Sequence, residues 1–279
     1  MRTTAQKIVA AVIAMAACLF TAQPAYANQG KEMVTFGDSF TANGGAPGAR
    51  GVKSPYNPPI DIHPCFNDTR NWAHQTARNL GHDIADYSCN GTSYWLDIFV
   101  NNAIRTGNIG RDTKEVVLMY GGLQPDTYVD TLANAALPNI PKGSNYRGFL
   151  DFQFRKIRRA APNARITMVN YLPMTVNDTV CAVNHRNVLN VVVPVTIPGA
   201  TFIEDEFNRE IGRAANALGV NFINLHDRAK THDPCQPDPA QRWAVLVQTP
   251  TAPSVMPAHP TDVGHDGMAR IITQDLQVR

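Results

Sequence analysis

The sequence predicts an α/β domain in which a central parallel β-sheet is covered by helices on both faces. Two short apolar runs, Met33–Phe36 and Lys114–Tyr120, have the length and residue types of buried strands. Between them, apolar residues recur at helical spacing across Asn71–Leu80, and Gly81 ends that pattern. Strands that alternate with helices imply parallel β-α units, whose sheets are buried on both faces. We expect a single domain, because roughly 250 residues can form one substantial core.

Residues 1–27 have the features of a secretory signal peptide. Arg2 and Lys7 precede an apolar run from Ile8 to Phe20, and Ala25-Tyr26-Ala27 has the form of an A-x-A cleavage site. The run is too short and too rich in alanine to form a stable membrane span. We therefore expect a secreted, extracytoplasmic protein whose remaining residues, 28–279, form the domain.

The chain that remains after cleavage carries no net charge. The sequence has 25 basic and 23 acidic residues, and the two basic residues of the signal segment leave 23 of each sign. A protein that binds nucleic acid needs a basic excess to neutralise phosphates, so we expect no nucleic-acid partner. We also expect no cofactor, and a monomer.

The other elements follow in chain order. Residues 42–64 are rich in glycine and proline and are expected to form a loop. Tyr146–Ala160 has the pattern of a basic amphipathic helix, with its cationic cluster near the C-terminus, where cations complement the helix dipole. Thr201 and Glu204 have the spacing of a capping box at the start of a helix that reaches Leu218. The remaining expectations are strands at Asp83–Cys89, Arg165–Leu172 and Asn221–Leu225, a proline-rich aperiodic stretch over 228–258, and a closing helix at Gly264–Leu276.

Four cysteines remain after cleavage, at positions 65, 89, 181 and 235. An even number of cysteines in an exported chain predicts disulfides, and four cysteines allow three pairings. A zinc site is the alternative, but no C-x-x-C or H-x-x-x-H spacing supports it, and we expect no metal.

Four short segments carry residues suited to hydrolase chemistry. In chain order they are Gly37-Asp38-Ser39, Asp86–Thr92, Val116–Gly122 and His259–His265. In this order they resemble the signature blocks of the SGNH (GDSL) hydrolases, as found in secreted actinobacterial-type esterases and lipases. The segment Val116–Gly122 resembles the strand that leads into the third of these blocks. The resemblance implies a flavodoxin-like, three-layer α/β/α sandwich with the site at the C-terminal ends of the strands. It also favours the disulfides Cys65–Cys89 and Cys181–Cys235, each of which closes a separate loop region.

Ser39 lies just past the end of the first predicted strand, where open parallel sheets place their ligands. Acyl-ester hydrolysis needs an activated hydroxyl, a base, and donors for the tetrahedral oxyanion. The resemblance implies that Ser39 is the nucleophile and that the N–H groups of Ser39 and Gly91 are oxyanion donors. Glycine suits a place where substrate approaches the backbone closely. The alternative for Gly91 is a simple turn glycine after a disulfide-bonded cysteine.

Two histidines compete for the role of base. The family's base precedes a proline in the loop before the last helix, and His259-Pro260 matches that pattern. The aspartate expected three residues earlier is replaced by Met256, whose backbone carbonyl is then expected to orient the imidazole, as in some secreted actinobacterial members. The pair Asp262 and His265 is the alternative; we expect instead that Asp262 complements the dipole of the last helix, that Thr261 caps that helix, and that His265 is structural.

The third block departs from the family pattern. The family has Gly-x-Asn there, and the asparagine side chain donates to the oxyanion. This chain has Gly121-Gly122-Leu123-Gln124, and leucine cannot donate. Either Gln124 reaches the site, or two backbone donors suffice, or the reaction is slowed by about 10²–10³.

The sequence therefore predicts a secreted serine esterase or lipase that cleaves acyl esters of lipids or acylated glycans through a Ser39 acyl-enzyme. The competing hypothesis is a catalytically weak or non-catalytic domain, or an acyltransferase, that binds acylated envelope glycans or lipids. Leu123 and Met256 favour the second hypothesis, whereas Ser39 and His259 favour the first.

Overall fold

The structure, a computed structural model, describes residues 30–44, 51–56, 65–92, 95–122, 124–136, 145–185, 192–249, 256 and 258–278. The expected signal peptide and Leu123 lie outside these residues. At the centre is a five-stranded sheet in which every neighbouring pair of strands is parallel. In spatial order its strands are β4 (Ile84–Asp86), β1 (Met33–Gly37), β5 (Glu115–Met119), β6 (Arg165–Val169) and β9 (Asn221–Ile223).

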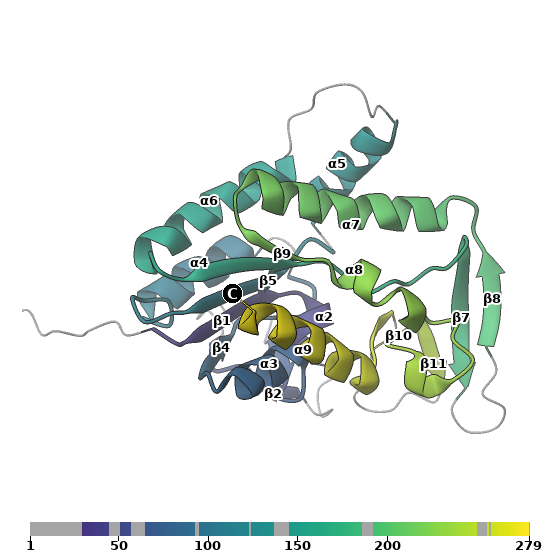
Figure 1. The fold of residues 1–279 in the computed structure, drawn as a ribbon, viewed down its shortest axis with the longest axis horizontal. Helices are drawn as coiled ribbons and strands as arrows, with labels where there is room; N and C mark the ends of the chain where they lie inside the picture. Colours follow the sequence, from purple (N-terminus) through teal and green to yellow (C-terminus); the bar gives the residue numbers. More distant parts are fainter. Residues whose placement is uncertain are drawn as a thin grey trace, which may run out of the picture.

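Helices cover both faces of this sheet (Figure 1). One face carries α4 (Leu96–Arg105), α6 (Asn145–Ala160) and α7 (Ala200–Ala217), and α5 (Pro125–Ala136) packs against α6 and α7. The other face carries α3 (Trp72–Leu80) and the closing helix α9 (Asp262–Gln277). The expected three-layer α/β/α sandwich is therefore confirmed.

The two central strands are buried throughout because helices lie above and below them. All five residues of β1 and all five of β5 are buried, including the polar residues Thr35 and Glu115. Gly37 and Met119, the last residues of these strands, are register partners, so both strands end at the same edge of the sheet. Side chains that follow β1 and β5 consequently meet at that edge.

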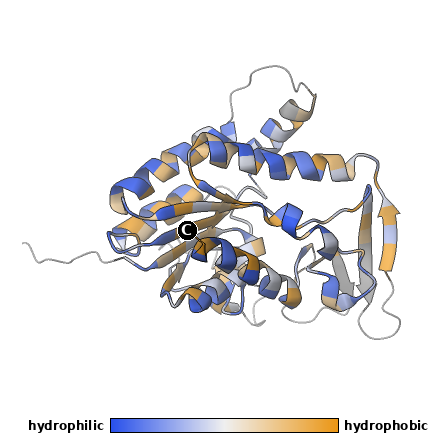
Figure 2. Cartoon of the chain, in the orientation of Figure 1, coloured by the Kyte–Doolittle hydropathy of each residue, from blue (hydrophilic) through white to orange (hydrophobic). Residues whose placement is uncertain are grey.

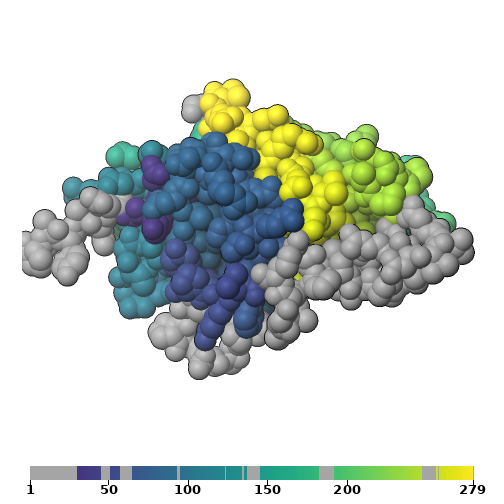
Figure 3. All heavy atoms as spheres, turned by 90° about the horizontal axis from the view of Figure 1, so that it is seen from below, coloured from purple at the N-terminus to yellow at the C-terminus, as the bar shows by residue number. Residues whose placement is uncertain are grey.

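Helices α3 and α9 are far apart in sequence but lie side by side in the fold, as Figure 3 shows in blue and yellow. Polar contacts join them: Gln75 Nε2 donates to Asp266 Oδ1 at 2.8 Å, and Asn79 Nδ2 donates to Thr273 Oγ1 at 3.3 Å. The loop that carries His259 leads directly into α9, so this packing anchors one side of that loop.

Several expected elements differ in detail from the observed ones. The expected strand Asp83–Cys89 shortens to β4, although Cys89 N still donates to Gly37 O at 3.0 Å, which keeps the following segment beside β1. The prediction of a capping box at Thr201 and Glu204 is wrong. Helix α7 begins at Ala200 after Gly199, and the Glu204 carboxylate accepts instead from the backbone N–H groups of Met174 and Thr175, because that loop packs against the helix.

A second, smaller group of strands lies beside one end of the sandwich and was not predicted. Strand β7 (Thr179–His185) pairs antiparallel with β8 (Val192–Thr196) and parallel with β11 (Val247–Thr249). Strand β10 (Ala244–Val245) pairs antiparallel with β12 (His259–Pro260). The shorter elements are β2 (Gly51–Lys53), which pairs with β3 (Phe66–Asp68), the helices α2 (Ser39–Ala42) and α8 (Leu225–Arg228), and 3₁₀ turns at Lys230–His232 and Pro239–Gln241.

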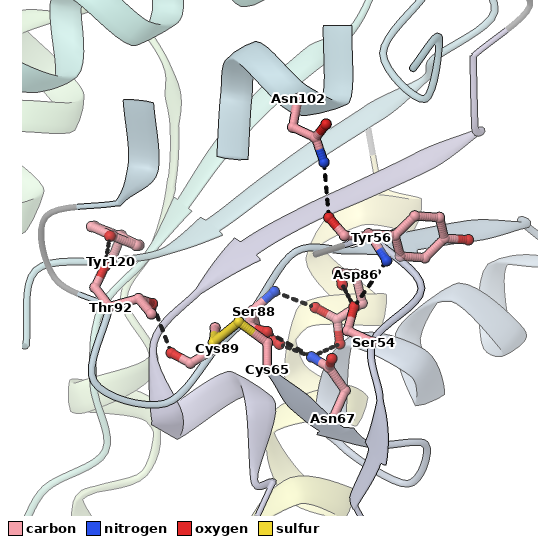
Figure 4. The surroundings of a disulfide bond; sticks show 10 residues. All are labelled: Ser54, Tyr56, Cys65, Asn67, Asp86, Ser88, Cys89, Thr92, Asn102 and Tyr120. Carbon is pink, nitrogen blue, oxygen red and sulfur yellow. Dashed lines mark hydrogen bonds between the residues drawn. A yellow bond between two sulfur atoms is a disulfide. The ribbon is translucent and has the colours of Figure 1, made fainter. Parts of the chain in front are cut away.

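Both disulfides have the pairing that the resemblance implied. Cys65 joins Cys89, and Cys181 joins Cys235. Around the first bond, Asn67 Nδ2 donates to the carbonyl of Ser88 at 2.8 Å and Thr92 Oγ1 donates to the carbonyl of Cys89 at 2.8 Å (Figure 4). The disulfide and these hydrogen bonds together fix the segment that carries Gly91.

Candidate active site

Ser39 lies at the first residue of the short helix α2, immediately after β1. Asp38 caps this helix, its carboxylate accepting from Phe40 N at 2.9 Å. A side chain at Gly37 would come 2.2 Å from Thr41 Oγ1, so only glycine allows the chain to turn this tightly between strand and helix. The turn leaves the Ser39 side chain 7% exposed at the C-terminal edge of the sheet.

His259 is the histidine that reaches Ser39. Its Nε2 lies 2.6 Å from Ser39 Oγ, which is hydrogen-bond distance for a nucleophile and its base. The imidazole comes from β12, where His259 pairs with Val245 of β10, and the Phe40 ring packs against it with the ring centroids 5.1 Å apart. Strand pairing and ring packing thus hold the base at the serine, although 220 residues separate the two in sequence.

His265 does a different job. It is buried in the first turns of α9, and its Nδ1 accepts from the backbone N–H of Trp72, the first residue of α3, at 3.2 Å. The cap of α9 is Thr261, whose hydroxyl accepts from Gly264 N at 3.0 Å, and Asp262 follows in the first turn. The geometry therefore brings His259 to Ser39 and uses His265 to join two helices.

Met256 lies against the segment that carries the second block. Its sulfur accepts from Asn90 Nδ2 at 3.6 Å, so position 256 is next to the residue that precedes Gly91. Gly91 has a φ of +70°, a backbone conformation that favours glycine. The roles of the Met256 carbonyl and of the Gly91 N–H remain predictions.

The structure does not favour Gln124 as an oxyanion donor. Its side chain is buried, and its Nε2 donates to Asp126 Oδ2 at 3.1 Å within the start of α5. The described residues that line the cavity at Ser39 do not include Gln124. The Gln124 side chain is thus bound to a residue in the first turn of the helix that follows it.

Tyr171 is a site residue that sequence reasoning missed. Its hydroxyl donates to the buried carboxylate of Asp38 and accepts from Gly122 N at 2.7 Å. Asn208 of α7 holds the Tyr171 backbone, since its Oδ1 accepts from Tyr171 N at 2.9 Å. Tyr171 therefore joins block one to block three. Its position just after β6, at the carboxyl end of a parallel strand, is the signal that could have identified it.

The Asp38 carboxylate is unusual because its partners are neutral. Burial raises the pKa of Asp38 to about 6, although hydrogen bonds from the Tyr171 hydroxyl and from the N–H groups of Phe40 and Gly122 favour its charged form. The same burial, together with the nearby Asp38 charge, holds the pKa of Tyr171 well above its ordinary value. Tyr171 accordingly stays protonated and can keep donating to Asp38.

A cavity of about 500 Å³ opens beside Ser39 and His259. Its wall is mainly apolar, formed by the loop after β6, the start of β7, the first half of α7, and residues near β10 and β12. The apolar or aromatic lining residues are Phe40, Tyr128, Tyr171, Leu172, Met174, Val180, Ala200, Ile203, Phe207, Leu246 and Ala258. Such a wall fits a hydrocarbon chain placed next to the reacting serine.

The residues that the structure describes contain no group of three or more His, Cys, Asp or Glu side chains that could hold a metal ion. Within the same ranges, every helix is too short or too polar to cross a bilayer.

The chain is similar to known lipases in sequence and in fold. Residues 35–266 match the model of the GDSL-like Lipase/Acylhydrolase family. Lipase 2 of Streptomyces coelicolor is 23% identical over 277 residues, covering 89% of this chain and 86% of that protein. The extracellular lipase of Streptomyces rimosus superposes with a TM-score of 0.53 at 16% identity, covering 87% of this chain and 97% of its own. Phospholipase A1 of Streptomyces albidoflavus gives a TM-score of 0.54 at 16% identity, with coverages of 88% and 98%. The two solved structures share the fold with this chain.

Proposed function

Because the chain belongs to the GDSL-like lipase/acylhydrolase family, we propose that it is a secreted serine hydrolase that cleaves carboxylic esters of fatty acyl chains. Ser39 is the nucleophile and His259 the base. The observation that carries this proposal is the 2.6 Å distance between Ser39 Oγ and His259 Nε2 at the mouth of an apolar cavity.

The first half of the reaction forms an acyl-enzyme. His259 Nε2 takes the Ser39 proton while Oγ attacks the ester carbonyl, and the oxygen of that carbonyl becomes an oxyanion. The backbone N–H groups of Ser39 and Gly91 donate to this oxyanion. The imidazolium then gives its proton to the leaving alcohol. In the second half, water attacks the acyl-enzyme with His259 again as base, and the fatty acid leaves.

His259 works here without a carboxylate three residues before it. The backbone carbonyl of Met256 accepts a hydrogen bond from the Nδ1–H group and so fixes the tautomer in which Nε2 is the acceptor. A neutral carbonyl stabilises the imidazolium less than a carboxylate does. Replacing the family's aspartate by the Met256 carbonyl therefore lowers kcat and leaves the reaction the same.

The apolar cavity takes the acyl chain of the ester. Tyr171, Val180 and Phe207 line this cavity together with Ser39. The names of the relatives support acyl substrates, since one is a lipase and one is a phospholipase A1. Secretion is supported by the signal-like segment, by two disulfides, and by the extracellular origin of the Streptomyces rimosus lipase.

A matched pair of histidine variants tests the assignment of the base. His259→Asn removes Nε2, and His265→Asn keeps an acceptor near the position of Nδ1, where Trp72 N donates. On p-nitrophenyl esters of increasing acyl length, His259→Asn should lower kcat by about 10⁴ or more, whereas His265→Asn should mainly lower stability. The reverse ranking would assign the base to His265 and overturn the proposal.

One observation favours a second function, that of an acyltransferase or an acyl-binding domain with weak hydrolysis. Gln124 is bound to Asp126, so no described side chain of block three donates to an oxyanion. A weak oxyanion site slows hydrolysis but leaves acyl binding intact. Adding an alcohol or sugar acceptor to the same assay discriminates, because a transferase forms the new ester faster than it releases free acid.

A further inference from the structure

Strand β8 exposes a row of apolar side chains at the edge of the molecule. Val193, Val195 and Ile197 are 43%, 44% and 48% exposed, and Phe202, at the start of α7, is 51% exposed. Figure 2 shows β8 as an orange arrow at the outer edge of the fold. Single exposed apolar residues are ordinary, but a contiguous row of them marks a contact surface.

This row continues the wall of the acyl cavity. Val195 is the register partner of Val180 on β7, and side chains directly opposite each other in an antiparallel pair lie on the same face. Val180 lines the cavity that contains Ser39 and His259. Val193 lies two positions from Val195 on β8, so it shares the face of Val195. Ile197 follows the last residue of β8, and its N–H donates to the carbonyl of Asp178 at 2.7 Å, which extends the pairing of the hairpin by one residue. A chain that leaves the cavity past Val180 therefore meets this row.

The hairpin presents the row on a fixed support. Cys181, next to Val180 in sequence, is buried and bonded to Cys235. On the other side, Asp178 N donates to Thr201 Oγ1 at 2.8 Å and Gly199 N donates to Asp178 Oδ2 at 3.0 Å, which ties the end of the hairpin to α7. Phe202 and the cavity residue Ile203 are thus held close to the hairpin.

The segment that carries this row has no ionisable side chain of its own. Residues 192–203 contain no Asp, Glu, Lys, Arg or His. An uncharged apolar row cannot attract an anionic partner through charge. Its contribution to binding comes from the removal of apolar surface from water.

A second copy of the chain is a poor occupant of the row. Four exposed apolar residues are far fewer than the roughly 20–30 residues that each partner contributes to a stable interface. Pro194 lies in the middle of β8, and edge strands that carry proline are poor templates for adding another strand. The hydrocarbon border of a lipid assembly needs neither a large interface nor strand pairing.

We propose that Val193, Val195, Ile197 and Phe202 form a docking row that binds the surface of a zwitterionic phospholipid assembly and delivers an acyl chain past Val180 to Ser39. This inference rests on the proposed function, since the lipid acyl chain is the substrate of the same cavity. Docking raises the local concentration of ester at Ser39 and leaves the chemical step unchanged.

The test uses the mature protein with Ser39→Ala, so that lipid is not consumed, and phosphatidylcholine vesicles in a flotation assay. The triple variant V193T/V195T/I197T keeps β-branched side chains and adds hydroxyls to the docking row. Its control, V52T/V278T, changes valines that are 55% and 83% exposed and lie away from β8. The docking-row variant should bind vesicles at least about tenfold more weakly than its parent, and the control should bind like the parent.

With Ser39 restored, hydrolysis of phosphatidylcholine vesicles should fall about tenfold in the docking-row variant while kcat/KM on soluble p-nitrophenyl butyrate stays unchanged. Absence of turnover on the soluble ester would count against the proposed function, but the binding result would still stand. Equal vesicle binding by parent and docking-row variant would overturn the inference, as would binding that requires anionic lipid or is lost at high salt. A dimer of the parent that the triple variant converts to monomer would assign the row to a second copy instead.

Discussion

The two ends of the parallel sheet carry ionisable groups in opposite ways. At the N-terminal ends of the strands, opposite charges are paired: Lys31 with Asp83 at 2.9 Å and Lys114 with Glu32 at 2.6 Å near the surface, and Arg165 with the buried Glu115 at 2.6 Å. At the C-terminal ends, Asp38 is buried among neutral donors. Each end has a cavity, of about 910 Å³ at the first and about 500 Å³ at the second.

The pKa shifts at the two ends run in opposite directions. The hydrogen bond from Lys114 lowers the pKa of Glu32, so the pair favours charge, whereas burial raises the pKa of Asp38 to about 6. Exposed ion pairs contribute little to stability, and shifted groups in closed pockets mark functional sites. The larger cavity therefore lies beside the ion pairs at the N-terminal ends of the strands, and the smaller one lies beside Ser39 and His259 at the C-terminal ends. Of these two cavities, the smaller one contains Ser39, His259 and the buried Asp38 whose pKa is raised.

The largest expected effect separates the two ends by activity. Ser39→Ala should lower kcat on a p-nitrophenyl ester by about 10⁴ or more, because nucleophile and base act as a unit. Glu32→Gln, which breaks an ion pair at the other end, should leave kcat within about twofold. Thermal unfolding serves as the control, since neither change removes core packing. A large loss of kcat in Glu32→Gln would break the comparison.

The next effect concerns Tyr171. Tyr171→Phe removes the hydroxyl that joins Asp38 to Gly122, so Ser39 and block three lose a shared anchor. We expect kcat/KM to fall by about 10–100-fold, and the pKa of Asp38 to rise further because a donor to its charged form is lost. Tyr128→Phe is the matched control, because that hydroxyl donates to the carbonyl of Gly122 at 2.5 Å but does not touch Asp38. Equal kcat/KM values for the two variants would show that the bond from Tyr171 to Asp38 has no role in the reaction.

Both disulfides lie close in sequence to residues of the candidate active site. Cys89 precedes Gly91, and Cys181 follows the cavity residue Val180. From sequence separations of 24 and 54, replacing either pair by serines should lower the free energy of unfolding by about 3–4 kcal/mol. Urea unfolding measures this loss. Loss of activity from the folded Cys65–Cys89 variant alone would tie the first disulfide to the position of Gly91, and unchanged stability in both variants would contradict the estimate.

The smallest predicted effect is the pH dependence of stability that Asp38 causes. A carboxyl whose pKa is raised on folding binds its proton more tightly in the folded state, so its contribution is most favourable below the unfolded pKa. Because folding raises the pKa of Asp38 from its ordinary value of 3.8 to about 6, this group should lower the free energy of unfolding by about 3 kcal/mol as pH rises through that window. Asp38→Asn should remove this slope while keeping a helix-capping residue. Parallel pH profiles for the two proteins would mean that Asp38 titrates normally.

The central strands and the catalytic candidates could be predicted from the sequence for different reasons. β1 and β5 are buried on both faces, so they appear as continuous apolar runs that a short window detects. Ser39 and His259 lie in short signature segments, where the chemistry fixes both residue type and spacing. Neither prediction needed knowledge of distant contacts.

What the sequence could not supply depends on contacts between distant segments. Tyr171 acquires its role from Asp38, 133 residues away, and its position after β6 is the one local feature that marks it. Helix α4 escaped prediction because it contains β-branched and aromatic residues and begins at Trp95 without a side-chain cap. The capping box failed at Glu204 because its carboxylate found donors in another loop. Tertiary partners decided the outcomes at Tyr171 and Glu204, whereas the local composition of α4 concealed that helix.

Reaction with a fluorophosphonate probe tests the central claim most directly, because it reports an activated serine without any assumption about substrate. The wild-type protein should gain one adduct, and peptide mapping should place it on Ser39. Ser39→Ala should gain none, and His259→Asn should react far more slowly than His265→Asn. Absence of labelling in the folded wild-type protein, or an adduct that persists in Ser39→Ala, would contradict the assignment of Ser39 and His259 as nucleophile and base.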